Sequence, residues 1–214
     1  MGFDFQTVSS ELITESPILA LRRDEVSMPS GGTAHRDVVE HLGAVAVVAL
    51  DTDGNIAMVN QYRHSVKRRL WELPAGLLDV RGESELAGAK RELQEEAGLA
   101  ADSWAVLCDL VTSPGFSEEA VRIFLARDLY EVDRLTDTGD EEDDMEFRWI
   151  ALDDAVREIL SGEIVNSIAI AGIFAAHEVV ERGNRARNVE EAFDLRPTSI
   201  ASRRRGEDLK ALDA

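Results

Sequence analysis

The sequence predicts an α+β fold, a mixed α/β sandwich in which strands come first and helices are interleaved among them. Short apolar stretches of strand length recur from the amino terminus to residue 127. Two segments instead show helical periodicity, residues 84–97 and residues 152–182. With 214 residues and a hydrophobic content of 44%, the chain is long enough to bury the core of one large domain.

Residues 1–40 alternate short apolar and polar pieces around the turn "MPSGGTAH". This pattern predicts a strand, a hairpin loop and a second strand. The piece is too small to fold alone, so we expect it to pack on the main domain or on a second subunit. A main domain at 41–188 and a polar tail at 189–214 follow it. The tail carries "RRR", and we expect it to be partly disordered.

The main domain opens with two apolar stretches, "AVAVVAL" and "IAMVNQY", on either side of "DTDGN". Asp53 and Gly54 supply the chemistry of a tight turn, which predicts a β-hairpin. The following segment, "ELPAGLLDVRGE", is predicted as a loop because proline and glycine interrupt any regular period. Further strands are expected at 104–111, at 120–127 and in "FRWIAL", after an acidic loop, "DEEDD". The stretch 152–182 supplies one or two helices, divided near Gly162 or Asn166.

Residues 84–97 are predicted to form a helix that ends at Gly98, a residue well suited to a C-terminal cap. At about 100° per residue, one face of this helix is apolar and is directed at the core. That face consists of Leu86, Ala89, Leu93 and Ala97. A carboxylate stripe lies directly beside it and consists of Glu85, Glu92 and Glu96, with Glu95 and Arg91 further round the helix.

Glu92 and Glu96 stand one helical turn apart, and like charges at this spacing destabilise an isolated helix by a few tenths of a kcal/mol. A hard divalent cation would offset this repulsion. Mg²⁺ is commonly held by one or two carboxylates together with waters and substrate phosphates. The alternative is a solvated acidic face without a ligand, which is the usual explanation of such a stripe taken alone.

The formal net charge of −19 argues against nucleic-acid binding, which needs a cationic surface. An acidic protein that handles phosphates is instead expected to recruit metal ions. Cys108 is the only cysteine, so an intramolecular disulfide is impossible and a reducing compartment is compatible. The longest apolar run, "LGAVAVVAL", is far shorter than a membrane span, and the amino terminus lacks the features of a signal peptide. We therefore expect a soluble cytoplasmic protein that does not contact a membrane.

A series of fixed spacings runs through residues 76–99: Gly76, Glu83, Arg91, Glu92, Leu93, Glu95, Glu96, Gly98 and Leu99. This series resembles the Nudix signature, G-x5-E-x7-R-E-U-x-E-E-x-G-U, in which U is a bulky aliphatic residue. The loop before the helix is one residue longer here than in the signature. "LWELPAGLLD", "QYRH" at 61–64 and "SPGFSEE" at 113–119 further resemble the ADP-ribose pyrophosphatase branch, of the actinobacterial type.

The resemblance implies the Nudix α/β/α sandwich, with the N-terminal strands as an additional antiparallel β-sheet segment that is exchanged between the subunits of a homodimer. It also implies hydrolysis of ADP-ribose, a small nucleoside diphosphate sugar, to AMP and ribose 5-phosphate. Two alternatives stay open. One is another substrate, such as GDP-mannose or an oxidised nucleotide. The other is a Nudix-like sensor that binds ADP-ribose without cleaving it, although such sensors usually degrade the signature glutamates, which are all present here.

By the same resemblance, the metal ligands are Glu92 and Glu96 for a central Mg²⁺, the backbone carbonyl of Ala75 as a third ligand, and Glu95 for a second metal or through water. Glu96 thereby also counts among the catalytic residues. Mn²⁺ would suit the same oxygen ligands. Arg91, which lies away from the stripe, is expected to hold the loop in place by pairing with Glu83 rather than to touch substrate.

The other candidate residues lie outside the helix. A catalytic base is expected in the acidic loop at 139–146, where the resemblance points to Glu142, with Glu141 as its close rival. A merely solvated charge run is the alternative for this loop. Arg63 follows a strand, and its guanidinium suits the diphosphate. Arg36 corresponds to a family arginine that reaches across the dimer, and Glu119 to a family carboxylate that contacts the terminal ribose or supports the site.

Overall fold

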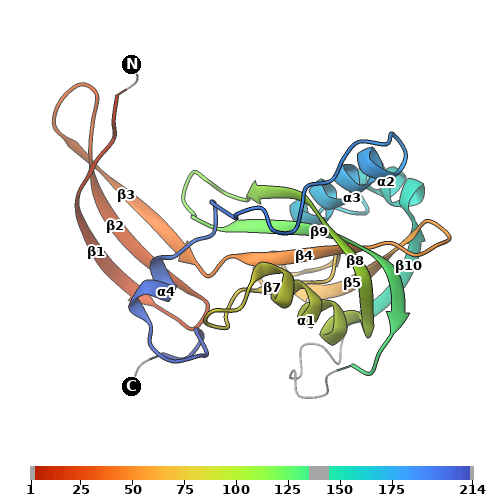
Figure 1. The fold of residues 1–214 in the computed structure, drawn as a ribbon. Helices are drawn as coiled ribbons and strands as arrows, with labels where there is room; N and C mark the ends of the chain where they lie inside the picture. Colours follow the sequence, from red (N-terminus) through yellow and green to blue (C-terminus); the bar gives the residue numbers. More distant parts are fainter. Residues whose placement is uncertain (1–2, 135–144, 213–214) are drawn as a thin grey trace.

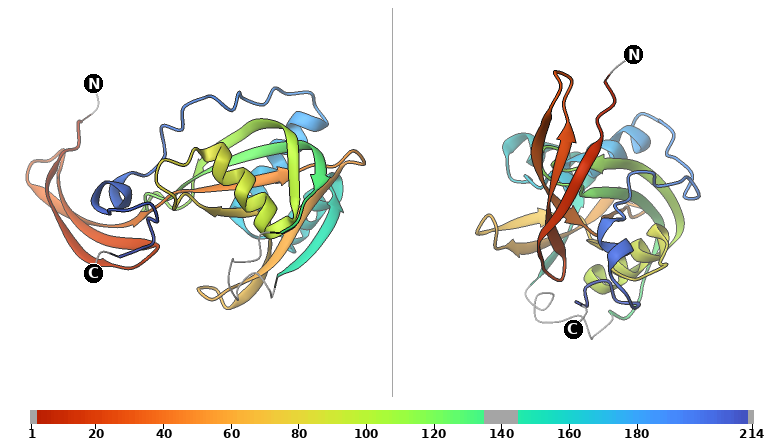
Figure 2. Two further views of the ribbon diagram at one scale, coloured as in Figure 1. Left: turned by 60° about the horizontal axis from the view of Figure 1, so that its bottom comes forward. Right: turned by 90° about the vertical axis from the view of Figure 1, so that its left-hand side faces the viewer.

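The computed structural model describes residues 3–134 and 145–212 of the chain. Its first sheet, the N-terminal sheet, is antiparallel with the order β1-β2-β3 and consists of β1 (Thr7–Glu15), β2 (Leu19–Ser27) and β3 (Thr33–His41). This sheet extends away from the rest of the molecule (Figures 1 and 2). The sequence had predicted one strand fewer, because β1 is exposed along nearly its whole length and shows little apolar pattern.

Two further sheets form the body of the molecule. The four-stranded sheet has the order β7-β4-β9-β8 and consists of β4 (Ala44–Ala49), β7 (Ala75–Leu77), β8 (Leu99–Val111) and β9 (Ala120–Glu131). The three-stranded sheet has the order β10-β5-β6 and consists of β5 (Asn55–Arg63), β6 (Arg68–Glu72) and β10 (Glu146–Ala151). Strands β4 and β9 run parallel, and the other pairings in these two sheets are antiparallel.

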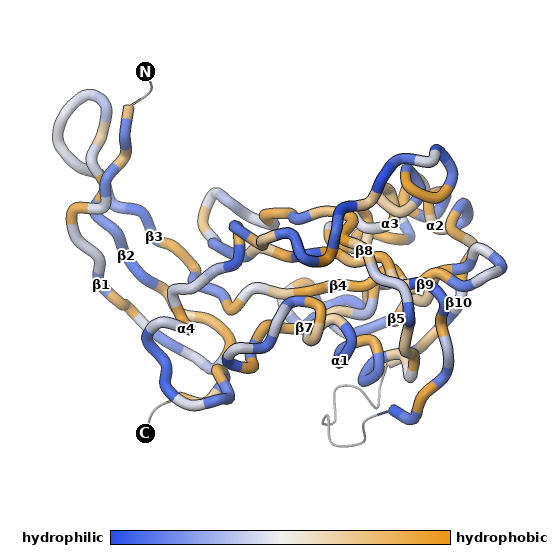
Figure 3. Tube along the Cα trace, viewed as in Figure 1, coloured by the Kyte–Doolittle hydropathy of each residue, from blue (hydrophilic) through white to orange (hydrophobic). Residues whose placement is uncertain are grey.

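Helices cover both faces of the body. Helix α1 (Glu85–Ala97) lies on one side, and α2 (Leu152–Ser161) and α3 (Ser167–Val180) lie on the other (Figure 1). Strand β4 is buried on both of its faces, as the continuous apolar run of a central parallel strand requires. Val48 packs toward Ile173 of α3, and Val47 toward Leu93 of α1. Figure 3 shows the hydrophobic stretches concentrated where the sheets and α3 pack together. The predicted α/β/α layering, with an additional N-terminal antiparallel sheet, is therefore confirmed.

The predicted hairpin of β4 and β5 is wrong. The turn is present, since the Asp51 carboxylate accepts hydrogen bonds from the backbone N–H groups of Asp53 and Asn55, at 2.9 and 2.7 Å. The strands on its two sides, however, belong to different sheets and share only an isolated bridge between Leu50 and Ile56. Turn chemistry is local, whereas the choice of β9 as the partner of β4 is set by burial of both faces of β4.

Helix α1 follows the prediction closely. The Ser84 hydroxyl accepts a hydrogen bond from the Ala87 N–H at 3.2 Å, and Gly98 ends the helix in the left-handed region at φ 64°. Ala89 and Leu93 on its apolar face are fully buried. The division of the later helical stretch is also confirmed, since Gly162 caps α2 and the Asn166 side chain caps α3.

The C-terminal segment differs from its prediction. Residues 189–212 lie along the body and the N-terminal sheet, and they include the short helix α4 (Ser199–Arg203). Ile200 and Leu209 are buried against Leu42, so two apolar residues in a polar stretch dock it. The expected disorder is therefore wrong for this segment. In the described part of the chain, no helix has the length and apolar character that crossing a membrane requires.

Candidate active site

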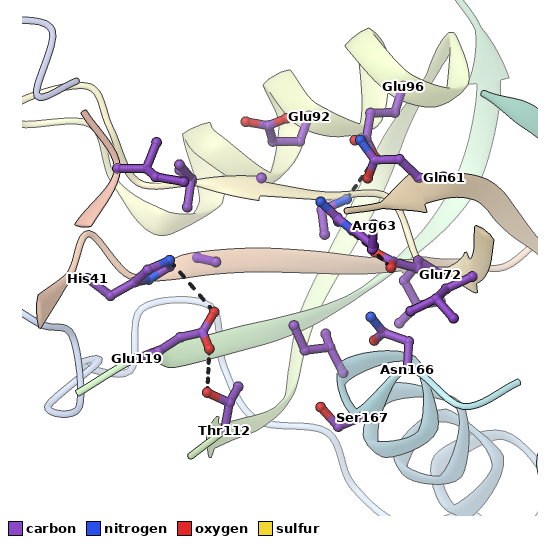
Figure 4. Close-up of a pocket in the computed structure, with 18 of the residues that line it drawn as sticks. His41, Gln61, Arg63, Glu72, Glu92, Glu96, Thr112, Glu119, Asn166 and Ser167 are labelled. Atoms are coloured by element: carbon purple, nitrogen blue, oxygen red, sulfur yellow. Dashed lines mark hydrogen bonds and ion pairs between the residues drawn. The ribbon is translucent and has the colours of Figure 1, made fainter. Parts of the chain in front are cut away.

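A cavity of about 1080 Å³ opens between α1, the ends of several strands and the start of α3. Figure 4 shows Glu92 and Glu96 on one side of it, with His41, Glu119 and Thr112 on the other. The structure brings most of the sequence candidates together here. Those that line the cavity are Arg63, Ala75, Glu92, Glu95, Glu96 and Glu119. Arg36 is not in this lining, and Glu141 and Glu142 lie outside the described residues.

The two carboxylates of α1 are held in defined positions. Both Glu92 and Glu96 are 8% exposed. The Ala75 N–H donates a hydrogen bond of 2.9 Å to Glu96, which ties the helix to β7. A Cβ atom at Gly76 would lie 1.9 Å from the carboxyl carbon of Glu92. Glycine at position 76 therefore leaves the space that the Glu92 carboxylate occupies, and a side chain there would displace that carboxylate.

Arg91 lies at the centre of an acidic cluster. Its guanidinium donates to Glu83 at 3.2 Å, so the predicted pairing is confirmed. The expectation that Arg91 lies away from the stripe is wrong, because its long side chain turns back along the helix. It reaches Glu92 at 2.6 Å, Glu95 at 3.1 Å and, at the longer distance of 3.5 Å, Asp79. Arg91 thus contacts four carboxylates, of which Asp79 also pairs with Lys210.

The pKa of Glu92 reflects this excess of carboxylates over cations. Burial raises the pKa of Glu92 to about 7, and the neighbouring Glu95 and Asp79 add to the rise, although Arg91 opposes it. A cluster with more carboxylates than cations suits a hard divalent ion that takes oxygen ligands. Within residues 3–134 and 145–212, however, no three carboxylate, histidine or cysteine side chains converge as metal ligands would. Here the Arg91 guanidinium supplies the positive charge that Glu92 and Glu95 share.

Arg63 lines the cavity at the end of β5. It forms a two-pronged ion pair with Glu72 of β6, at 3.0 and 2.7 Å (Figure 4). The Glu72 side chain is only 5% exposed, so the pair fixes Arg63 at the wall of the cavity. Arg36, in contrast, is exposed on β3 and donates to the backbone carbonyl of His35 at 2.9 Å. Within one chain, Arg36 therefore does not join the other candidates.

Glu119 belongs to a small polar group on the opposite wall. The Thr112 hydroxyl donates a hydrogen bond to one of its oxygens, and His41 Nε2 lies 3.8 Å from the other (Figure 4). The Gly43 N–H donates to His41 Nδ1 at 3.1 Å, so a neutral His41 carries its proton on Nε2, facing Glu119. Burial lowers the pKa of His41, although Glu119 and Glu118 oppose this, which favours the neutral ring.

The sequence analysis missed His41, Thr112 and Lys210, all of which line the cavity. None of them belongs to a local motif. They reach the cavity from the N-terminal sheet, from the loop before β9 and from the C-terminal segment. Only the tertiary arrangement of these segments identifies them.

An α/β/α sandwich with a glutamate-bearing helix beside a polar cavity defines a class, the Nudix hydrolases. The model of the NUDIX domain matches residues 40–168, and the chain belongs to this family. Members of the family generally use a divalent cation.

Among its relatives, the ADP-ribose pyrophosphatase of Mycobacterium tuberculosis (strain ATCC 25618 / H37Rv) is 55% identical over 94% of this chain and 97% of its own length. The ADP-ribose pyrophosphatase of Bacillus subtilis (strain 168) is 35% identical over 76% of this chain and 86% of its own. The crystal structure of an ADP compounds hydrolase superposes with a TM-score of 0.73 at 19% identity, covering 86% of this chain and 97% of that one. This structural likeness supports the fold.

Proposed function

We propose that the protein hydrolyses the diphosphate of ADP-ribose to AMP and ribose 5-phosphate with the help of Mg²⁺. The observation that carries this proposal is the acidic cluster on α1, where Glu92 and Glu96 are buried beside the cavity and one arginine serves several carboxylates. The 55% identity to a relative named ADP-ribose pyrophosphatase supports the choice of substrate.

Glu92, Glu96 and the backbone carbonyl of Ala75 are our proposed ligands for Mg²⁺, and Mn²⁺ would suit the same oxygens. Glu95 would bind a second ion or act through water. A bound divalent ion would neutralise diphosphate charge and lower the pKa of a coordinated water. The protein itself fixes these groups, since the Ala75 N–H orients Glu96 and the absence of a side chain at Gly76 makes room for Glu92.

Arg63 would bind the diphosphate in this proposal, and Glu119 would bind the terminal ribose or support the site. Glu72 orients the Arg63 guanidinium, which suits the phosphate oxygens, and Thr112 orients the Glu119 carboxylate, which suits a ribose hydroxyl. Arg36 would act from the partner subunit of a homodimer in which the N-terminal strands are exchanged. The exposed apolar residues of β1, which include Val8, Leu12 and Ile13, support an interface formed by residues 1–40.

The catalytic base in this proposal is Glu142, with Glu141 as the alternative. Glu142→Gln should lower kcat by about 10² to 10⁴-fold while the KM for ADP-ribose changes little. Glu141→Gln is the matched control, because it removes the same charge from the neighbouring position. If only the Glu141 variant loses activity, the two roles are exchanged, and if both retain full kcat, the base lies elsewhere.

The main test is product analysis at fixed Mg²⁺ with ADP-ribose, GDP-mannose, NADH and diadenosine polyphosphates. We expect AMP and ribose 5-phosphate to form from ADP-ribose with the highest kcat/KM of the panel. A higher kcat/KM for GDP-mannose would reassign the substrate without changing the chemistry. Tight binding of ADP-ribose without turnover would identify a sensor instead. We further propose a cytoplasmic location, with which the single cysteine, Cys108, is compatible.

A further inference from the structure

The C-terminal segment pairs with the loop that precedes α1. Val80 and Asp208 form an antiparallel bridge. The Leu209 N–H donates to the Asp79 carbonyl at 2.7 Å, and the Arg81 N–H donates to the Glu207 carbonyl at 2.8 Å. Figure 1 shows this blue segment between the N-terminal sheet and the loop before α1. Residues 207–209 are thus hydrogen-bonded directly to the loop that leads to the acidic cluster.

Two arginines, Arg204 and Arg81, hold the same segment in place through hydrogen bonds to backbone carbonyls. Arg204, which is 5% exposed, donates to the backbone carbonyls of Ser16, at 2.5 Å, Pro17 and Leu209. Arg81 donates to the backbone carbonyl of Gly206 at 2.7 Å. Hydrogen bonds from a charged donor are among the stronger ones in proteins. The backbone leading to residue 210 is therefore held in place.

Lys210 projects from this anchored backbone into the wall of the cavity. Its Nζ lies 2.6 Å from the Asp79 carboxylate, whose side chain is only 9% exposed, whereas the Lys210 side chain is 48% exposed. A lysine ammonium has three N–H donors, so the contact with Asp79 leaves donor capacity that faces the cavity. The hydrogen bond to Asp79 raises the pKa of Lys210, and the charges of Asp208 and Glu92 add to this, although burial opposes it, so the side chain is cationic.

We propose that Lys210 is a substrate-binding residue that donates to a phosphate oxygen of the bound diphosphate. The inference rests on the proposed function, because it assumes an anionic ligand in the cavity. Such a ligand enters a space lined by several carboxylates, where each added cation lowers the repulsion. Asp79 positions the ammonium through one contact, whereas Glu72 positions the Arg63 guanidinium through two. The C-terminal segment thereby completes a site that the signature helix alone leaves too acidic.

The competing explanation is that Lys210 only neutralises Asp79. A double-mutant cycle separates the two roles. We expect Lys210→Ala to raise the KM for ADP-ribose about tenfold with little change in kcat, as loss of a charged hydrogen bond to the ligand would. A smaller but clear rise should remain on an Asp79→Asn background, because Asp79 orients the ammonium but does not bind the ligand, and Lys210→Arg should restore most of the affinity. An effect of Lys210→Ala that disappears on the Asp79→Asn background would overturn the proposal, as would an unchanged KM.

Arg205→Ala is the matched control, since Arg205 is an exposed cation of the same segment and does not line the cavity within the described residues. It should leave KM unchanged. Calorimetric titration with inorganic pyrophosphate and Mg²⁺ provides a readout that does not depend on turnover. Lys210→Ala should raise the Kd of pyrophosphate about tenfold. If ADP-ribose is not hydrolysed but this Kd still rises, the proposed function fails and the role of Lys210 stands. An unchanged Kd would contradict the role of Lys210 itself.

Discussion

Glu40 and Glu92 are both buried glutamates beside arginines, and their environments shift their pKa values in opposite directions. Glu40 is 1% exposed on β3 and accepts hydrogen bonds from Arg22, at 3.0 Å, and from Arg203. Burial alone would raise the pKa of Glu40, but the hydrogen bonds from Arg203 and Arg22 lower it below its ordinary value. Burial raises the pKa of Glu92 to about 7, Glu95 and Asp79 add to the rise, and Arg91 opposes it.

The difference lies in how many cations each carboxylate receives. Glu40 has two arginines, from β2 and from α4, and their contacts join the N-terminal sheet to the C-terminal segment. Glu92 shares its one arginine, Arg91, with other carboxylates, and it lines the cavity. Removing a carboxylate from a matched buried pair destabilises the fold, whereas an undermatched one at a cavity is a candidate ligand for a cation. The contrast predicts that a substitution of Glu40 will mainly lower stability, whereas a substitution of Glu92 will mainly lower activity.

The largest effect is expected from Glu92→Gln. Removal of a proposed metal ligand should lower kcat by about 10³-fold or more, since a bound cation contributes several kcal/mol to catalysis. Steady-state kinetics at saturating Mg²⁺ would measure this, with Glu40→Gln as the control of identical chemistry. Similar losses of kcat in both variants, at temperatures where both are folded, would contradict the distinction between the two glutamates.

The next effect concerns stability. Glu40→Gln removes the carboxylate that Arg22 and Arg203 share, although Arg22 keeps Asp24 and Glu118 as partners. The loss of charged hydrogen bonds to a buried carboxylate should lower the free energy of unfolding by about 2 to 3 kcal/mol. Urea denaturation at neutral pH measures this value. Arg23→Ala, which breaks an exposed pair with Asp37, should cost far less. An equal loss in both variants would show that the burial of Glu40 adds nothing.

The pH dependence should also differ. The folded-state pKa of Glu92 lies above its unfolded value, so its contribution to stability is complete below about pH 4.5 and is lost as pH rises through about 7. In the metal-free protein this loss amounts to at most about 3 kcal/mol. Comparing urea denaturation of the protein and of Glu92→Gln at several pH values isolates it. The free energy of unfolding of the protein should fall relative to that of Glu92→Gln from pH 4.5 to 7. A difference between the two that stays constant with pH would refute the raised pKa.

The smallest effect is expected from Gly76→Ala. The new methyl group would displace the Glu92 carboxylate, and misplacing a catalytic group should lower kcat/KM by about 10 to 10²-fold. Stability should change little, because the displaced atoms are the end of a flexible side chain. Gly172→Ala is the contrasting control, since its methyl would meet the core atoms of Leu73 at 2.6 Å and Ile123 at 3.1 Å. It should lower the melting temperature instead.

The sequence predicted α1 well because its signals are local. Ser84, Gly98 and the apolar face at Ala89 and Leu93 lie within one helix and act through neighbouring backbone groups. The signature spacing similarly placed Glu92 and Glu96 on the side of the helix that borders the cavity. Periodicity and capping chemistry are therefore sufficient for this part of the candidate site.

The rest depends on contacts between segments that are distant in the sequence. The pairing of β4 with β9 instead of β5, and the docking of Leu209 beside Leu42, follow from burial that no local pattern encodes. His41 and Lys210 reach the cavity only because their backbones are held by other elements. The position of Arg91 was predicted wrongly because a helical wheel places the Cα atom and not the end of a long side chain.

The parallel pairing of β4 also has a consequence for how the protein acquires its structure. Ala44 pairs with Val121, so the central strand has no partner on that edge until a segment far along the chain has arrived. Such non-local pairing slows folding, and the run "AVAVVA" stays available to other molecules in the interval. Dilution during refolding should therefore favour the native protein over aggregates.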